Sequence, residues 1–157
     1  MHPPILETRR LHWPDEAACA GFAQGLAAKP ALRNALIELQ GPLGAGKTTF
    51  VRHLLRALGA SGRIKSPTYA VMEPYELPGL AAWHFDFYRF DDPREWEDAG
   101  FRDVFAAPGL KLVEWAERAA GLLPVADLRM ELAIRDDNQR EVKLSANTAA
   151  GVALLAP

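Results

Sequence analysis

The segment Gly41-Pro42-Leu43-Gly44-Ala45-Gly46-Lys47-Thr48 has the residue types and the spacing of a phosphate-binding loop. A P-loop requires glycine at its first position, four variable residues, and then glycine, lysine and serine or threonine. The glycines let backbone N–H groups converge on phosphate oxygens, and the N-terminus of the following helix adds partial positive charge. The pattern predicts that Lys47 reaches the β- and γ-phosphates and that the Thr48 hydroxyl binds Mg²⁺. The alternative is a glycine-rich turn that binds nothing.

Two acidic residues are candidates to hold Mg²⁺, directly or through water, beside such a loop. Asp86 lies inside the aromatic segment 82–90, where a charge without a partner is costly. If this segment is a strand, alternation places Asp86 on the same face as His84. Glu114 follows the apolar run 110–113, where the carboxyl end of a parallel strand would face the phosphates. A salt bridge or an exposed strand end remains the alternative for each acid.

Four further features have a functional interpretation and a simpler one. Ser66-Pro67-Thr68-Tyr69 suits a switch loop that senses the γ-phosphate, although an ordinary turn is favoured on sequence alone. His84 would polarise an attacking water, but a hydrogen-bonded core histidine is favoured. Arg140 would touch ATP from a late hairpin, while a solvated arginine is the simpler interpretation. Trp115 suits packing in the core or at its rim, with stacking on a partner as the alternative.

Apolar periodicity and turn residues predict the elements that position these side chains. Strands are expected at residues 5–12, 35–40, 68–72, 82–90, 110–113, 128–134 and 141–145. Helices are expected at 17–28, from Lys47 onward with Gly59 as the C-terminal cap, and after Asp91-Asp92-Pro93. Residues 147–157 either fray or form a short helix. These elements predict one α/β domain over residues 1–157 with the three-layer P-loop NTPase fold, a mostly parallel central sheet and antiparallel strands late in the chain.

Composition fits a small domain and excludes several classes of protein. The chain has 157 residues, 49% of them hydrophobic and 24% charged, with a formal net charge of −2. Such a balance gives no sign of a nucleic-acid or membrane surface protein. Cys19 is the single cysteine, which excludes an internal disulfide and a cysteine metal cage. The start of the chain does not read as a signal peptide, so a cytoplasmic location is expected.

Taken together, the motifs resemble the TsaE family, the small ATPases of bacterial tRNA threonylcarbamoyladenosine biosynthesis. The matching segments follow the family's order and spacing at 43–50, 65–69, 73–75, 84–89 and 113–115. Many NTPases share the P-loop alone, whereas the other segments in combination are much more specific. The resemblance implies an ATPase that works with TsaB and TsaD, where TsaD transfers threonylcarbamoyl to adenosine in tRNA. ATP binding and hydrolysis would reset that complex between turnovers, so tRNA would be met only indirectly.

Carried over by position, the resemblance implies a role for each site residue. The residues expected to hold ATP are Gly41, Leu43, Gly44, Ala45, Gly46, Lys47, Thr48, Thr49 and Arg140. Those expected at Mg²⁺ are Thr48, Glu114 and Asp86, and the catalytic set is Asp86, Glu114 and Lys47. Ser66, Pro67 and Thr68 become a switch-like loop. The family usually has aspartate where this chain has Pro42, which affects only the expected flexibility of the loop.

Three other functions fit the sequence less well than this interpretation. A small-molecule kinase usually carries an arginine-rich lid over the transferred phosphoryl group, but the arginines of the second half are scattered. A GTPase switch would need an Asn-Lys-x-Asp sequence to read guanine, and none is present. A relic used only as a scaffold conflicts with the intact Lys47, Thr48 and two acids. ATP hydrolysis remains the expected activity.

Overall fold

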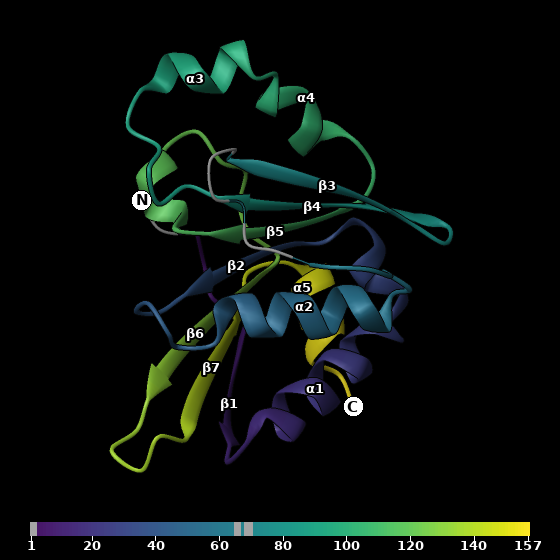
Figure 1. Ribbon diagram of the computed structural model, residues 1–157, viewed down its shortest axis with the longest axis vertical. Helices are drawn as coiled ribbons and strands as arrows, with labels where there is room; N and C mark the ends of the chain where they lie inside the picture. Colours follow the sequence, from purple (N-terminus) through teal and green to yellow (C-terminus); the bar gives the residue numbers. More distant parts are fainter. Residues whose placement is uncertain (1–2, 65–66, 68–70) are drawn as a thin grey trace.

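A seven-stranded mixed sheet forms the middle of the molecule (Figure 1). The structure is a computed structural model, described for residues 3–64, 67 and 71–157. The strands are β1 Glu7–Trp13, β2 Leu36–Gln40, β3 Met72–Leu77, β4 Leu80–Asp86, β5 Leu110–Glu114, β6 Leu128–Ile134 and β7 Arg140–Ala146. Their order across the sheet is β1-β7-β6-β2-β5-β4-β3. The four central strands β6, β2, β5 and β4 run parallel to one another, whereas the other three pairings are antiparallel, so the sheet is mixed rather than mostly parallel.

Helices cover both faces of the sheet and give it a layered architecture (Figure 1). One face carries α1 Glu16–Ala27, α2 Lys47–Ala57 and α5 Ala149–Leu155, and the other carries α3 Pro93–Asp98 and α4 Phe101–Ala106. Two 3₁₀ turns, η1 Pro30–Asn34 and η2 Ala116–Ala119, complete the described elements. Alternation along β2 separates the two cores, because Ile37 and Leu39 belong to the cluster under α1 and α2 whereas Leu36 belongs to the cluster under α3 and α4.

The placing of the antiparallel strands corrects one expectation. They were expected late in the chain, but β1 also pairs antiparallel with β7, and β3 pairs antiparallel with β4. Both edges of the sheet are therefore antiparallel, and one of the edge strands opens the chain. The physical reason is local for β3, because the tight turn at Pro78-Gly79 returns the chain directly alongside its neighbour.

The segments around β3 and β4 differ most from the predicted boundaries. A strand was predicted at 68–72, but residues 68–70 lie outside the described part of the chain and β3 begins at Met72. Pro74 lies within β3, where it is tolerated because β3 is an edge strand. The predicted strand 82–90 ends at Asp86, since the Asp86 carboxylate accepts a hydrogen bond from the Tyr88 N–H at 2.9 Å and turns the backbone.

Helix ends follow the predicted signals. The Asp15 carboxylate accepts a hydrogen bond from the Ala18 N–H and caps α1, and Asp92 caps α3 in the same way through the Arg94 N–H. Gly59, with φ 107°, follows the end of α2. Of the two outcomes left open for the last residues, the structure shows the short helix, α5, with Leu154 and Leu155 buried. Within the described ranges, no helix is long and apolar enough to cross a membrane.

Candidate functional site

The glycine-rich loop 41–46 joins the central strand β2 to the N-terminus of α2. Three of its residues have positive φ angles, namely Gly41 at 148°, Gly44 at 81° and Gly46 at 108°. Gly41 also has no room for a side chain, because an added Cβ would lie 2.5 Å from the Leu132 carbonyl oxygen. Gly46 is the N-cap of α2 and supplies no side-chain hydrogen bond, so the first turn of the helix keeps N–H groups available for an anion.

Lys47 begins α2 and lies folded against the loop. Its side chain is nearly buried, with the residue 5% exposed, and its Nζ donates a hydrogen bond to the Gly41 carbonyl at 2.6 Å. The same nitrogen lies 4.1 Å from the centre of the Trp115 ring, within the range of a cation–π contact. Burial lowers the pKa of the Lys47 ammonium, while the carboxylates of Glu114 and Asp86 act in the opposite direction.

The two acids predicted from the sequence lie side by side at the carboxyl ends of parallel strands. Asp86 of β4 is paired in register with Glu114 of β5. Glu114 is 3% exposed, and its Oε2 accepts a hydrogen bond from the Thr48 hydroxyl at 3.4 Å. The structure therefore brings Lys47, Thr48 and both carboxylates together at the N-terminus of α2. This outcome rests on strand alternation, which places the acids on the face of the sheet that α2 covers.

The donor set at this point suits a hard divalent cation. It offers two carboxylates and one hydroxyl, which are oxygen ligands of the kind that Mg²⁺ takes alongside water and substrate phosphates. Among the described residues, no group of three or more His, Cys, Asp or Glu is placed to hold a metal by itself. A cation here would therefore need ligands from a bound phosphate or from water as well.

His84 is fully buried and lies next to Glu114. Its Nε2 lies 2.6 Å from Glu114 Oε2, and both side chains are buried. Its Nδ1 is buried and has no hydrogen-bond partner within the described part of the chain. The prediction of a hydrogen-bonded core histidine is confirmed. Because Glu114 Oε2 contacts both His84 and Thr48, the histidine restricts where that carboxylate can point.

Arg140 differs from the solvated arginine that the sequence favoured. It is partly buried, and its Nε donates a hydrogen bond to the Ala45 carbonyl at 2.9 Å. The turn before it, with Asn138 at φ 64°, aims the side chain at the glycine-rich loop rather than at solvent. Spacing alone could not reveal this contact, since the two segments are 95 residues apart.

Trp115 packs at the rim of the site. Its ring centre lies 4.9 Å from that of Tyr88, and its backbone has the positive φ of 58° that is uncommon outside glycine. The packing interpretation is thus confirmed, and stacking on a partner stays a prediction. For the switch-like loop, Ser66 and Thr68 lie outside the described residues, so its role also stays a prediction.

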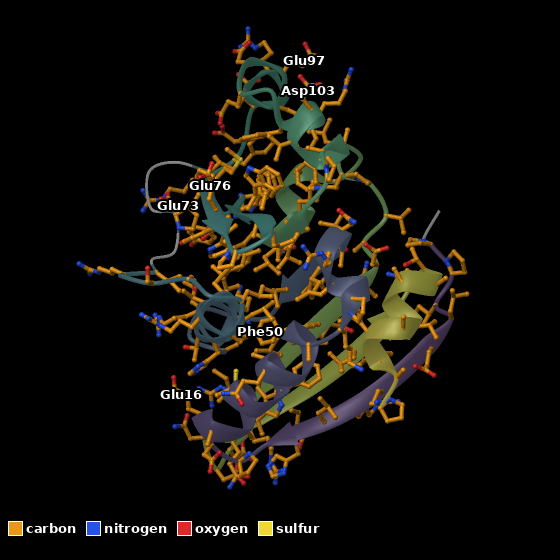
Figure 2. All side chains as sticks on the ribbon, turned by 90° about the vertical axis from the view of Figure 1, so that its right-hand side faces the viewer. Glu16, Phe50, Glu73, Glu76, Glu97 and Asp103 are labelled. Carbon is orange, nitrogen blue, oxygen red and sulfur yellow. The ribbon has the colours of Figure 1, made fainter. Side chains whose placement is uncertain are left out.

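A cavity of about 390 Å³ opens beside the glycine-rich loop and was missed by the sequence analysis. Its lining comes from the β1–α1 junction, the loop, α2 and the β6–β7 turn: Trp13, Pro14, Asp15, Glu16, Cys19, Ala45, Gly46, Thr49, Asn138 and Arg140. Figure 2 shows Glu16 at the start of α1 and Phe50 between α1 and α2. The centres of the Phe50 and Trp13 rings lie 6.3 Å apart, so aromatic packing supports the part of the cavity lining that Trp13 forms. The cavity joins elements far apart in sequence, which periodicity cannot predict.

These features define the class of protein first. It is a mixed α/β protein with a single sheet, in which a central parallel strand leads through a glycine-rich loop to a helix whose N-terminus faces two carboxylates. Comparison with known proteins supplies the particular family. The family model described as "Threonylcarbamoyl adenosine biosynthesis protein TsaE" matches residues 13–142. The chain therefore belongs to the TsaE family, and the resemblance drawn from its motifs is confirmed.

Individual relatives agree with that assignment. A protein of Haemophilus influenzae named tRNA threonylcarbamoyladenosine biosynthesis protein TsaE is 43% identical over 116 residues, which is 74% of this chain and 73% of the relative. The protein of the same name from Bacillus subtilis is 33% identical over 142 residues, or 88% and 87% of the two chains. The crystal structure of YdiB from Bacillus subtilis superimposes with a TM-score of 0.75 at 27% identity, covering 95% of this chain and 92% of that one.

Proposed function

We propose that the protein is a Mg²⁺-dependent ATPase that supports tRNA N6-threonylcarbamoyladenosine modification by a TsaB–TsaD complex. One observation carries the ATPase part of the proposal: an ammonium, a hydroxyl and two carboxylates converge where a glycine-rich loop meets a helix N-terminus. Membership of the TsaE family supports the part that concerns tRNA modification. Contact with tRNA is indirect in this proposal, through the complex, and the site of action is the cytoplasm.

Phosphate binding follows from the loop and from Lys47. Positive φ angles at Gly44 and Gly46 and the uncapped start of α2 favour backbone N–H groups directed at phosphate oxygens. Lys47 Nζ donates to the Gly41 carbonyl, and a β- or γ-phosphate would offer it a stronger, charged acceptor nearby. Leu43, Ala45 and Thr49 complete the proposed nucleotide contacts, the last through its place at the first turn of α2 and beside the cavity.

The metal-binding part of the proposal uses Thr48, Glu114 and Asp86. Their oxygens would share Mg²⁺ with the phosphates, and the cation would offset charge on the triphosphate. The hydrogen bond between His84 Nε2 and Glu114 Oε2 would orient this carboxylate before nucleotide binds. Asp86 is partly exposed beside it and is the residue we assign to positioning the attacking water.

The nucleoside part of ATP has a place in the cavity beside Gly46 and Thr49. This cavity lies next to the start of α2, and its lining includes neither Lys47 nor Glu114. The chain lacks the Asn-Lys-x-Asp sequence that reads guanine. ATP is therefore the nucleotide that we propose.

The proposal is tested by measuring phosphate release from ATP by the purified protein, alone and with TsaB and TsaD. We expect slow Mg²⁺-dependent hydrolysis by the isolated chain and a changed rate in the presence of both partners. A screen of small phosphoryl acceptors accompanies the assay, because a small-molecule kinase is the rival that uses the same loop. Rapid phosphorylation of a metabolite by the isolated chain would replace the ATPase proposal with that rival.

A further inference from the structure

Arg140 connects the β6–β7 turn to the glycine-rich loop through backbone carbonyl groups. Its Nε donates to the Ala45 carbonyl at 2.9 Å and its Nη2 to the Gly44 carbonyl at 3.3 Å. On the other side, Nη1 donates to the Asn138 carbonyl at 2.6 Å. The guanidinium is planar and always charged, so these bonds hold two segments in a fixed relation.

The anchor of this side chain is rigid. Arg140 is the first residue of β7 and is paired with Trp13 of β1 on one side and with Ile134 of β6 on the other. Its Cα is therefore fixed by two neighbouring strands, whereas the glycine-rich loop has no ladder of its own. Any restraint between the two segments acts mainly on the loop.

By holding these carbonyl groups, Arg140 also fixes the direction of the N–H group that follows each of them. All described peptide bonds are trans, and in a trans peptide the N–H points opposite to the C=O. Because Arg140 holds the Ala45 carbonyl, the Gly46 N–H is turned away from the guanidinium and into the loop. Holding the Gly44 carbonyl likewise turns the Ala45 N–H inward, where it donates to the Pro42 carbonyl at 3.1 Å.

Without this restraint, the Gly44–Ala45 and Ala45–Gly46 peptide groups could rotate easily, because each has a glycine next to it. Gly44 and Gly46 have φ angles of 81° and 108°, and glycine rotates through such values at low cost. A loop whose N–H groups must converge on phosphate gains from an external restraint, since ordering it on binding would otherwise weaken affinity.

We propose that Arg140 is a positioning residue that orients the Ala45 and Gly46 peptide groups of the loop before phosphate arrives. The inference rests on the proposed phosphate site and deepens it. Arg140 acts on the phosphates through the loop's backbone, and it also borders the cavity.

The test compares three variants with the wild type. Arg140→Ala removes all the carbonyl contacts, while Arg140→Lys keeps the charge but not the planar fork. Arg135→Ala is the matched control, since Arg135 belongs to the same hairpin but pairs only with Asp137 and Glu141 in the described structure. Calorimetry measures binding of Mg²⁺–ATP and of Mg²⁺–tripolyphosphate, which has no nucleoside. Hydrogen exchange of a peptide covering residues 41–50 is measured on the nucleotide-free proteins, and thermal melts check folding.

For Arg140→Ala we expect ATP and tripolyphosphate affinities to fall by the same factor, about tenfold or more, with faster exchange across the loop. Arg140→Lys should behave almost as Arg140→Ala, and Arg135→Ala as the wild type. Unchanged loop exchange would overturn the proposal, as would restored affinity in Arg140→Lys. Weaker ATP binding with normal tripolyphosphate binding would instead make Arg140 a direct nucleoside ligand. If the wild type bound neither ligand, the phosphate site itself would fail, while the exchange data would still decide whether Arg140 orders the loop.

Discussion

Glu114 lies at the centre of the site, with three polar residues next to it. Thr48, His84 and Asp86 lie beside it on α2 and β4, and it is nearly buried. A buried carboxylate is costly unless it is hydrogen-bonded, so its two hydrogen bonds explain how the fold tolerates it. The same contacts leave it directed at the space in front of Thr48, which is where a cation shared with phosphate would lie.

Replacing Glu114 with Gln is expected to weaken the Mg²⁺ dependence of ATP binding more than ATP binding itself. The amide keeps the shape of the side chain but removes the charge, and a charge-assisted contact contributes about 1.5–3 kcal/mol. Calorimetric titrations of ATP at several Mg²⁺ concentrations measure the effect. Glu97→Gln is the control, since Glu97 is exposed on α3, far from the loop (Figure 2). Equal Mg²⁺ dependence in the Glu114 variant and the wild type would remove this residue from the metal site.

Asp86→Asn separates binding from hydrolysis. If Asp86 positions the attacking water, the variant should release phosphate at least about 100-fold more slowly, a larger factor than any loss in Mg²⁺–ATP affinity, as for loss of a group that acts on a proton in the transition state. Single-turnover phosphate release beside calorimetry shows the split. A variant that hydrolyses at the wild-type rate would leave Asp86 with a structural role only.

At the scale of elements, the strands around the site could be predicted from sequence because burial on both faces produces short segments rich in apolar residues. The segments 35–40 and 110–113 are of this kind, and both were placed within one residue of β2 and β5. The two acids were also found from these segments, Asp86 as a carboxylate inside an aromatic strand segment and Glu114 just after an apolar one. The hairpin of β3 and β4 was harder, because Pro74 is acceptable only on an edge, and edges depend on the topology of the whole sheet.

Residues that act across the sheet could not be predicted in this way. Arg140 contacts the glycine-rich loop only because β6 lies beside β2 and β7 lies beside β6. Trp13 borders the cavity because β1, at the start of the chain, pairs with β7. Each contact depends on strand order, and hydrophobic periodicity carries no information about that order.

Two glycines in helices give opposite predictions at this scale. An added Cβ at Gly25 of α1 meets nothing within 4 Å, so Gly25→Ala should stabilise the protein by about 0.5–1 kcal/mol through lower unfolded-state entropy. At Gly151 of α5 the Cβ would lie 1.9 Å from the Asp127 carbonyl oxygen. Gly151→Ala should therefore destabilise by about 1–3 kcal/mol. Urea unfolding of both variants tests the pair, and a stabilising Gly151→Ala would contradict the close packing of α5 against the β5–β6 connection.

For the molecule as a whole, the reactivity of the single cysteine, Cys19, measures whether the core under α1 and α2 stays packed. Cys19 is 4% exposed within the cluster under α1 and α2, and burial, with a smaller effect of Glu16, raises the pKa of its thiol to about 12. The reactive thiolate is therefore scarce at pH 8 in the folded state. We expect a thiol reagent to modify the native protein very slowly at pH 8 and to react fully in denaturant. Fast modification of the native protein would show that α1 does not stay packed on the sheet.

The glycine-rich loop, Lys47 and Thr48 lie where the sheet, α2 and the cavity meet, and the proposed function requires that Mg²⁺–ATP binds there. Calorimetric titration of Mg²⁺–ATP into the folded protein tests it most directly, beside Lys47→Ala and the control Lys143→Ala on β7. We expect saturable binding by the wild type and by Lys143→Ala. In Lys47→Ala we expect a loss of about 1.5–3 kcal/mol of binding free energy, because a charged donor to the phosphates is removed. Absence of saturable heat with the wild type, or equal binding by Lys47→Ala, would contradict this expectation.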